Sequence, residues 1–266
     1  MSEIHLEEIA KSVRQEIIKS LAEAGSGHTA GSLDMVEILV ALYFKLLKHN
    51  SQNPDWAERD RLILSHGHTC PALYAVLAEA GYFPKTELQT LRKFGSKLQG
   101  HPHREWLRGL ETSSGPLGSG LSQAVGMALS ARMDLSAQYF YCLMSDGEMQ
   151  AGQTWEALML AGKEKLTNLI AIIDRNGIQI GGLTETIMPL EPLREKLEAF
   201  NWQVLEIDGH NFEQISGAVE TAKKIQEKPT IIIAHTIPGK GFAEFENDYR
   251  WHGKAPTQEQ IKNLLN

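Results

Sequence analysis

The chain has 266 residues, of which 42% are hydrophobic, and we expect residues 1–266 to fold as a single large domain. The net charge of −7 argues against a nucleic-acid-binding protein, because such proteins bind phosphate through clustered Lys and Arg. The sequence has no apolar run of the roughly 18 residues that a membrane span needs and no pattern of a secretory signal at its start, so we expect a cytoplasmic protein without membrane association.

The N-terminal part of the chain predicts two helices. Residues 4–24 place apolar side chains three or four positions apart, which is the spacing of an amphipathic helix: Leu6, Ile9, Val13, Ile17 and Leu21. We expect a second helix from Ser32, a favourable N-cap residue, to about Leu47.

Five short apolar runs follow and alternate with helical patterns, at residues 61–65, 139–144, 168–174, 202–208 and 229–235. Because these runs are mostly continuous in apolar residues, we expect strands that are covered on both faces. The alternation of strands and helices predicts an α/β fold in which a parallel sheet has helices on both faces. Such sheets bind ligands at the carboxyl ends of their strands.

Two polar segments lie directly after neighbouring predicted strands, namely Ser145-Asp146-Gly147-Glu148 and Asp174-Arg175-Asn176-Gly177. Their carboxylate and carboxamide oxygens suit Mg²⁺ or Ca²⁺, and a bound diphosphate could complete the shell of ligands. Gly147 would let the backbone approach a phosphate oxygen, and a helix expected from about Met149 would direct N–H groups toward the anion. An Asp-Gly pair after a strand is also common in plain turns, so the pattern alone leaves that alternative open.

Together these two segments resemble the Gly-Asp-Gly to Asn signature of thiamine-diphosphate enzymes. Five further motifs, in the same order, extend a resemblance to the transketolase family over nearly the whole chain: Gly25-Ser26-Gly27-His28, Ser65-His66-Gly67-His68, Gly100-His101-Pro102, Gly115-Pro116-Leu117-Gly118-Ser119-Gly120 and Trp251-His252-Gly253. The chain departs from the family pattern at Ser145, where the signature has Gly. It also departs at Ala151, where transketolases commonly carry a Glu that is thought to help connect paired cofactor sites.

The resemblance implies that thiamine diphosphate is bound through a divalent metal, Mg²⁺ or else Ca²⁺ or Mn²⁺. The implied metal ligands are Asp146, Asn176 and the backbone carbonyl of Ile178. The residues implied in cofactor binding are His68, Gly115, Pro116, Leu117, Gly147, Glu148, Asn176 and His252. The candidate catalytic residues, which would contact ketose oxygens near the reacting carbon, are His28, His101 and His252.

In this family a second domain binds the aminopyrimidine of the cofactor and supplies an activating Glu. No segment of this chain resembles that domain, and the chain ends at Asn266, soon after His252. The resemblance therefore implies a separate pyrimidine-domain subunit in an α2β2 assembly. The pair is expected to transfer a two-carbon ketol unit from a ketose or ketose phosphate donor to an aldose acceptor.

Three alternatives remain at this point. The chain could be a component of another thiamine-dependent enzyme, resembling deoxyxylulose-phosphate synthase or a 2-oxo acid dehydrogenase, or it could be a non-catalytic cofactor-binding subunit. It could also be a zinc metallohydrolase with four imidazole ligands: His66, His68, His101 and His103. Of the other histidines, His5, His49 and His210 are expected to be solvated, and His235 fits a hydrogen-bonded core residue as well as a site residue.

Overall fold

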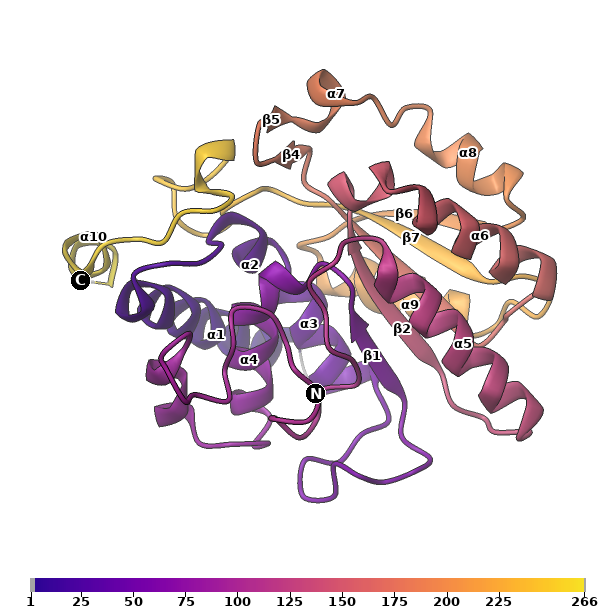
Figure 1. The fold of residues 1–266 in the computed structure, drawn as a ribbon, viewed down its shortest axis with the longest axis horizontal. Helices are drawn as coiled ribbons and strands as arrows, with labels where there is room; N and C mark the ends of the chain where they lie inside the picture. Colours follow the sequence, from indigo (N-terminus) through magenta and orange to yellow (C-terminus); the bar gives the residue numbers. More distant parts are fainter. Residues whose placement is uncertain (1–2, 266) are drawn as a thin grey trace.

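The computed structural model describes residues 3–265 and contains a five-stranded sheet with helices on both faces (Figure 1). Neighbouring strands are parallel, in the order β1-β2-β3-β7-β6. The predicted parallel α/β fold is confirmed, and each predicted strand is found to within one residue at either end. The strands are β1 (Arg61–Leu64), β2 (Phe140–Ser145), β3 (Leu169–Arg175), β6 (Gln203–Asp208) and β7 (Thr230–His235).

The two faces of the sheet carry separate apolar clusters, because successive strand residues point to opposite sides. In β3, for example, Ile172 packs into one cluster and Ile173 into the other. Burial on both faces explains why the strands are continuously apolar in sequence. One cluster includes side chains of α1 (Glu3–Ala24), α3 (Val36–Ala41), α4 (Cys70–Glu79), α9 (Phe212–Ala222) and α10 (Gln258–Leu265). The other includes side chains of α5 (Ser119–Met133), α6 (Gly152–Glu164) and α8 (Leu193–Ala199). Within residues 3–265, no helix is long and apolar enough to cross a membrane.

The helix expected from Ser32 to Leu47 is divided, so this prediction was wrong in its start and in its continuity. The segment forms α2 (Ala30–Asp34), then α3, then a π-helical turn, η1 (Leu42–Leu46). Ser32 is not an N-cap: it lies inside α2, and its hydroxyl donates to the His28 carbonyl oxygen at 2.6 Å. The division leaves Asp34 at the end of α2, fully buried.

The register of the sheet brings the two polar segments together. Ser145 at the end of β2 pairs with Asp174 of β3, so Asp146 and Asn176 begin adjacent loops at the same edge. The helix expected from Met149 was misplaced, because a 3-10 turn, η4 (Gly147–Gln150), comes first and α6 begins only at Gly152. After Asn176 the chain forms a short hairpin and a helical turn: β4 (Ile178–Gln179), β5 (Gly182–Leu183) and α7 (Thr184–Ile187). The other 3-10 turns are η2 (Gly67–Thr69), η3 (Lys85–Thr90) and η5 (Tyr249–Trp251).

Candidate active site

A cavity of about 520 Å³ lies at the carboxyl edge of the sheet. It is lined by residues from seven separate segments of the chain, and most of the residues predicted from the motifs are among them: His28, His68, His101, Gly115, Leu117, Gly147, Asn176, Ile178 and His252. The sequence motifs therefore converge in space, although they are spread over more than 200 residues of sequence.

Asp146 has one satisfied and one unsatisfied carboxylate oxygen. Its Oδ2 accepts hydrogen bonds from Arg175 Nη1 and the Gly177 amide, each at 2.8 Å, and from the Thr184 hydroxyl at 3.3 Å. Its Oδ1 is buried and has no hydrogen-bond partner among the described residues. Leaving a buried carboxylate oxygen unpaired is costly, and a divalent cation at this oxygen would remove that cost.

Asn176 lies beside Asp146 with its side-chain amide held in one orientation. Its Nδ2 donates to Asp34 and to Asp174, each at 2.9 Å, while its Oδ1 accepts from the Ile178 amide at 3.0 Å. Both Asn176 and Ile178 line the cavity. One carboxylate, one carboxamide and one backbone carbonyl are hard oxygen donors, so the residues present fit Mg²⁺, Ca²⁺ or Mn²⁺.

The charges at this edge favour a bound cation. Burial is the main factor that raises the pKa values of Asp34, Asp146 and Asp174, and it raises the pKa of Asp174 to about 8. The Arg175 guanidinium opposes this shift at Asp146 but also pairs with Glu185 and Glu191. Of the three buried carboxyl groups only Asp146 pairs with the guanidinium, so a divalent cation would be stabilised at this edge.

Three imidazole rings form a cluster above this edge. The ring centroids of His28, His68 and His252 are 4.9 to 5.5 Å apart. Burial is the main cause that lowers the pKa of each ring and of His101, and the pKa of His28 falls to about 4. At neutral pH the rings are therefore neutral, so each offers one N–H donor and one acceptor nitrogen. The Nδ1 atom of His28 is buried and has no partner among the described residues.

Glu148 and Pro116, both predicted to bind the cofactor, do not line the cavity. The Glu148 carboxylate is buried and accepts hydrogen bonds from the Ser65 hydroxyl and the Gly118 amide. It therefore connects the end of β1 to the loop that precedes α5. Ser145, which stands where the family signature has Gly, accepts from the Glu148 amide at 3.2 Å through its hydroxyl. Pro116 is exposed on its loop.

Gly67 explains how the chain segments approach each other closely below the cavity. A Cβ atom at this position would lie 2.3 Å from the Ser114 hydroxyl oxygen and 3.2 Å from the Gly115 amide nitrogen. A side chain at residue 67 would therefore push the 114–117 loop away from the end of β1.

The geometry does not support the zinc alternative, because its four imidazoles do not converge. His68 lies against His28 and His252, whereas His103 stacks on the Trp106 ring at a centroid distance of 4.8 Å. Over residues 3–265, no group of three or more His, Cys, Asp or Glu residues is arranged to hold a metal ion.

The prediction of solvated side chains was wrong for two histidines. The Nδ1 atom of His210 lies 3.0 Å from a Glu37 carboxylate oxygen, and its Nε2 accepts from the Ile237 amide at 2.8 Å. His49 contacts the Tyr82 hydroxyl and the Tyr43 carbonyl. His235 is exposed and pairs with Glu206, so neither role considered for it applies. These partners lie far away in sequence or on other elements, and local sequence context does not identify them.

The hairpin and the α7 turn after Asn176 contribute lining residues that the motifs did not indicate: Gln179, Ile180 and Gly181 from the hairpin and Ile187 from α7. A signal for the hairpin was present, because Ile178-Gln179-Ile180 alternates and is followed by Gly181-Gly182, a hairpin pattern. A hairpin that starts directly after a metal-ligand candidate must lie over the same edge of the sheet.

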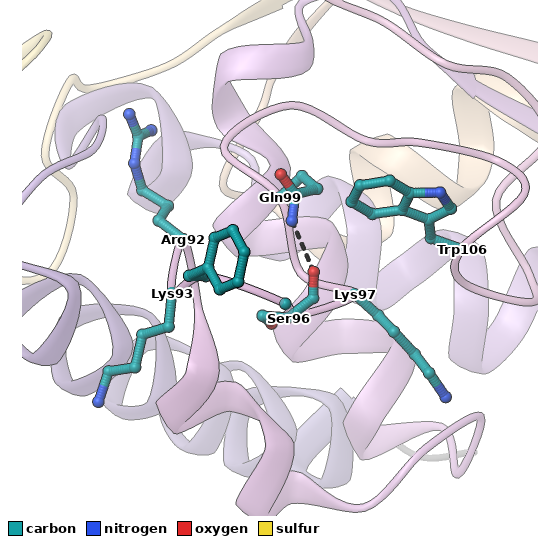
Figure 2. Close-up of a pocket in the computed structure, with 8 residues that line it drawn as sticks. Arg92, Lys93, Ser96, Lys97, Gln99 and Trp106 are labelled. Carbon is teal, nitrogen blue, oxygen red and sulfur yellow. Dashed lines mark hydrogen bonds between the residues drawn. The ribbon is translucent and has the colours of Figure 1, made fainter.

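A larger hollow of about 870 Å³ lies along the 92–106 segment (Figure 2). Figure 2 shows the side chains of Arg92, Lys93 and Lys97 extending in different directions, so their charges do not meet at one anion. The hydrogen bond drawn in Figure 2 joins two residues of this same segment, because Gln99 Nε2 donates to the Ser96 carbonyl oxygen at 2.6 Å. The convergent chemistry is therefore in the smaller cavity.

We expect His66→Gln to change how stability depends on pH. Burial lowers the pKa of His66 from its ordinary 6.5 to about 3, so the unfolded chain binds more protons than the folded chain in that range. The contribution of His66 to stability is complete above pH 6.5 and is lost as the pH falls toward 3, by about 1.4 kcal/mol per pH unit. The free energy of unfolding, measured with urea between pH 7.5 and 5, should fall more steeply with decreasing pH in the wild type than in His66→Gln.

The control is Ser20→Ala, because Ser20 is a buried polar residue without a titratable group. Its stability difference from wild type should stay constant over the same pH range. An equal stability difference for His66→Gln at pH 7.5 and pH 5 would contradict the buried neutral state of His66.

The sequence over residues 6–266 matches the protein family described as transketolase, thiamine diphosphate binding domain. The 6-deoxy-6-sulfo-D-fructose transketolase subunit SqwG of Clostridium sp. (strain MSTE9) is 46% identical, over 98% of this chain and 94% of that protein. An apulose-4-phosphate transketolase subunit of Phocaeicola vulgatus is 40% identical, over 95% of this chain and 89% of that protein.

The fold also matches solved structures of longer transketolases. The crystal structure of transketolase from Campylobacter jejuni aligns with a TM-score of 0.93 and 39% identity, over 99% of this chain and 42% of that one. The chain thus spans about two fifths of the longer enzyme and nearly all of the two bacterial subunits named above. It belongs to the transketolase family of transferases, and it corresponds to the thiamine-diphosphate-binding domain.

Proposed function

We propose that this chain is the metal- and diphosphate-binding subunit of a two-chain, thiamine-diphosphate-dependent transketolase. The observation that carries the proposal is the unpaired, buried Oδ1 of Asp146 beside the oriented amide of Asn176, below a cluster of neutral imidazoles. The near-complete coverage of relatives that are themselves named transketolase subunits supports the two-chain arrangement.

Asp146, Asn176 and the carbonyl of Ile178 would hold Mg²⁺, or Ca²⁺ or Mn²⁺ in its place, and the metal would hold the diphosphate. Thiamine diphosphate, when bound, supplies the stabilisation of a carbanion that ketol transfer requires. The other groups proposed to bind the cofactor are His68, His252, Gly147 and the loop of Gly115, Pro116 and Leu117. Glu148 would act on the cofactor indirectly, by holding Gly118 and Ser65 behind that loop.

His28, His101 and His252 are the residues that we propose contact the ketose oxygens. Their lowered pKa values keep the rings neutral, so each can donate one proton to a substrate oxygen without adding charge to the cavity. The unpartnered Nδ1 of His28 gives that ring an unused polar atom for a ligand.

The partner is proposed to be a pyrimidine-domain subunit that completes an α2β2 assembly and supplies the activating acid. Apolar side chains lie exposed near the cavity and along α6, where a partner would cover them: Leu117, Met159, Leu160, Ile180, Ile187 and Met188. Uncovered apolar patches of this kind are typical of association surfaces. Both cysteines are free and buried, which fits the proposed location in the reducing cytoplasm.

The substrates are proposed to be a ketose or ketose phosphate donor and an aldose acceptor. The names of the two similar bacterial proteins refer to sugars with a sulfonate and a phosphate group. The residues that would bind such a group are proposed to lie on the partner subunit.

We expect His28→Ala and His101→Ala to lower kcat/KM more than they lower cofactor affinity. Hydrogen bonds to substrate oxygens strengthen as charge develops, so kcat/KM of the reconstituted pair should fall on the order of 100-fold. His235→Ala is the matched control, since His235 lies outside the cavity and pairs with Glu206. A loss confined to thiamine-diphosphate affinity would reassign His28 and His101 as cofactor ligands.

The proposed function is tested by co-expressing the chain with a candidate pyrimidine-domain subunit from the same genome and assaying the purified pair. Ketol transfer between a ketose phosphate and an aldose is the expected activity. Decarboxylation of pyruvate or another 2-oxo acid, without ketol transfer, would favour a synthase or dehydrogenase component instead. A pair that binds the cofactor and catalyses neither reaction would favour a non-catalytic role.

A further inference from the structure

We infer that Asp34 is a positioning residue of the metal site, which fixes the side-chain amide of Asn176 so that its oxygen faces the cation. The inference rests on the proposed function, because it concerns the metal that Asp146 and Asn176 would hold. Asp34 is contributed by α2, which is remote in sequence from both strands that carry the site.

Both oxygens of the Asp34 carboxylate are engaged. Oδ2 accepts a hydrogen bond from Asn176 Nδ2 at 2.9 Å, and Oδ1 accepts from the Gly239 amide at 2.8 Å. The side chain is fully buried, so no solvent competes for these contacts. A carboxylate that accepts two fixed N–H groups has a defined orientation.

The amide of Asn176 has two protons, and the structure provides a carboxylate for each of them. One proton goes to Asp34 and the other to Asp174, both at an N–O distance of 2.9 Å. A flipped amide would direct its oxygen at these two carboxyl groups, so only one orientation is favourable. In that orientation Oδ1 lies toward the Ile178 amide and the cavity.

Asp174 alone does not determine this orientation as strictly. It engages only one of the two amide protons, and its other oxygen accepts from the Thr236 hydroxyl. Asp34 engages the second proton from a separate element and joins it to Gly239, in the segment that leads to His252. The same carboxylate thus connects the metal edge to the part of the chain that carries a histidine of the cavity.

Asp34→Asn separates this role from simple packing because it keeps the shape of the side chain. An amide has only one oxygen, so it cannot accept from both Asn176 Nδ2 and the Gly239 amide. In the variant, the new side-chain NH₂ group therefore faces either Asn176 Nδ2 or the Gly239 amide, and two hydrogen-bond donors oppose each other. Loss of an interaction that orients a metal ligand costs about 10- to 100-fold in metal affinity.

Glu37→Gln is the matched control. Glu37 is a buried acid on the next helix, but its partners are Arg14 and His210 and it does not contact Asn176. Its replacement therefore also weakens a buried polar network, while the orientation of the Asn176 amide stays intact.

The test combines calorimetry and NMR on the purified full chain. Titration with thiamine diphosphate in the presence of Mg²⁺ should show dissociation constants raised by about 10- to 100-fold in Asp34→Asn and unchanged in Glu37→Gln. In the free chain, the two side-chain amide proton resonances of Asn176, assigned by their loss in Asn176→Ala, should move in Asp34→Asn and stay in place in Glu37→Gln. Urea unfolding of both variants measures the structural cost separately.

If both variants lose cofactor affinity in proportion to their losses of stability, Asp34 has a structural role and does not position the metal ligand. Unchanged Asn176 amide resonances in Asp34→Asn would overturn the inference directly. If the wild type binds Mg²⁺ and thiamine diphosphate and Asp34→Asn binds them equally well, the inference fails and the proposed function stands. If the wild type does not bind Mg²⁺ and thiamine diphosphate at all, the proposed function fails, and the inference fails with it.

Discussion

Asp146→Asn should abolish metal-dependent binding of thiamine diphosphate while the chain stays folded. The position of Oδ2 must be an oxygen, because it accepts from Arg175, Gly177 and Thr184. The amide NH₂ group would therefore occupy the position of Oδ1 and direct a donor at the place of the cation. A site with so few protein ligands cannot compensate for the loss of its only carboxylate ligand.

This result is measured by calorimetric titration with thiamine diphosphate, with Mg²⁺ and then with a chelator, alongside circular dichroism of the free variant. Asp55→Asn is the control, since Asp55 lies on the surface. Its ion pair with Arg108 is long, with an N–O distance of 3.9 Å. Asp55→Asn should bind like the wild type. Full metal-dependent binding by Asp146→Asn would remove the metal assignment.

The purified chain should show no ketol transfer by itself and should gain activity only with a pyrimidine-domain subunit. The acids near the cavity are already committed: Asp146 faces the proposed metal, and Glu148 is held by Ser65 and Gly118. Glu185 pairs with Arg175 on the surface. None of these three carboxylates is free to activate the cofactor by proton transfer, so we expect the proposed partner to supply that group.

The measurement is a steady-state ketol-transfer assay of the chain, the partner and an equimolar mixture. Activity is expected in the mixture alone, and a mixture that contains Asp146→Asn is the inactive control. The exposed apolar residues near the cavity should also make the isolated chain prone to self-association, which light scattering would detect. Ketol transfer at full rate by the chain alone would contradict the two-chain arrangement.

The sequence predicted the sheet well because the signal for a doubly covered strand is local. An apolar run such as Ile170–Ile173 has few structural alternatives inside an α/β pattern, and parallel strands place their following loops at one edge. That reasoning brought Asp146 and Asn176 together correctly. It also placed Gly147 at the cavity, which it lines.

The parts that the sequence did not predict depend on long-range contacts. The break after Asp34 is associated with buried hydrogen bonds to Asn176 and Gly239, which lie far away in sequence. Glu148 faces Ser65 and Gly118 instead of the cavity because those partners meet only after β1 and β2 have paired. Composition and periodicity carry no information on such contacts.

Ala151 lies against the loop that precedes α5. A Cβ atom at Gly118 would be 2.8 Å from the Cβ of Ala151, so this small residue packs closely on the loop. Ala151 has no ionisable group, so residue 151 itself cannot supply the proton link that a Glu at this position is thought to provide between paired sites.

The position of the metal tests the central claim most directly. Crystals of the chain with Mn²⁺ and thiamine diphosphate, measured at the manganese absorption edge, would locate the ion from its anomalous scattering. We predict a single peak about 2.0 to 2.3 Å from Asp146 Oδ1, Asn176 Oδ1 and the Ile178 carbonyl oxygen, with the diphosphate beside it. A peak among the imidazoles of His28, His68 and His252, or ordered diphosphate with no metal at Asp146, would contradict the account.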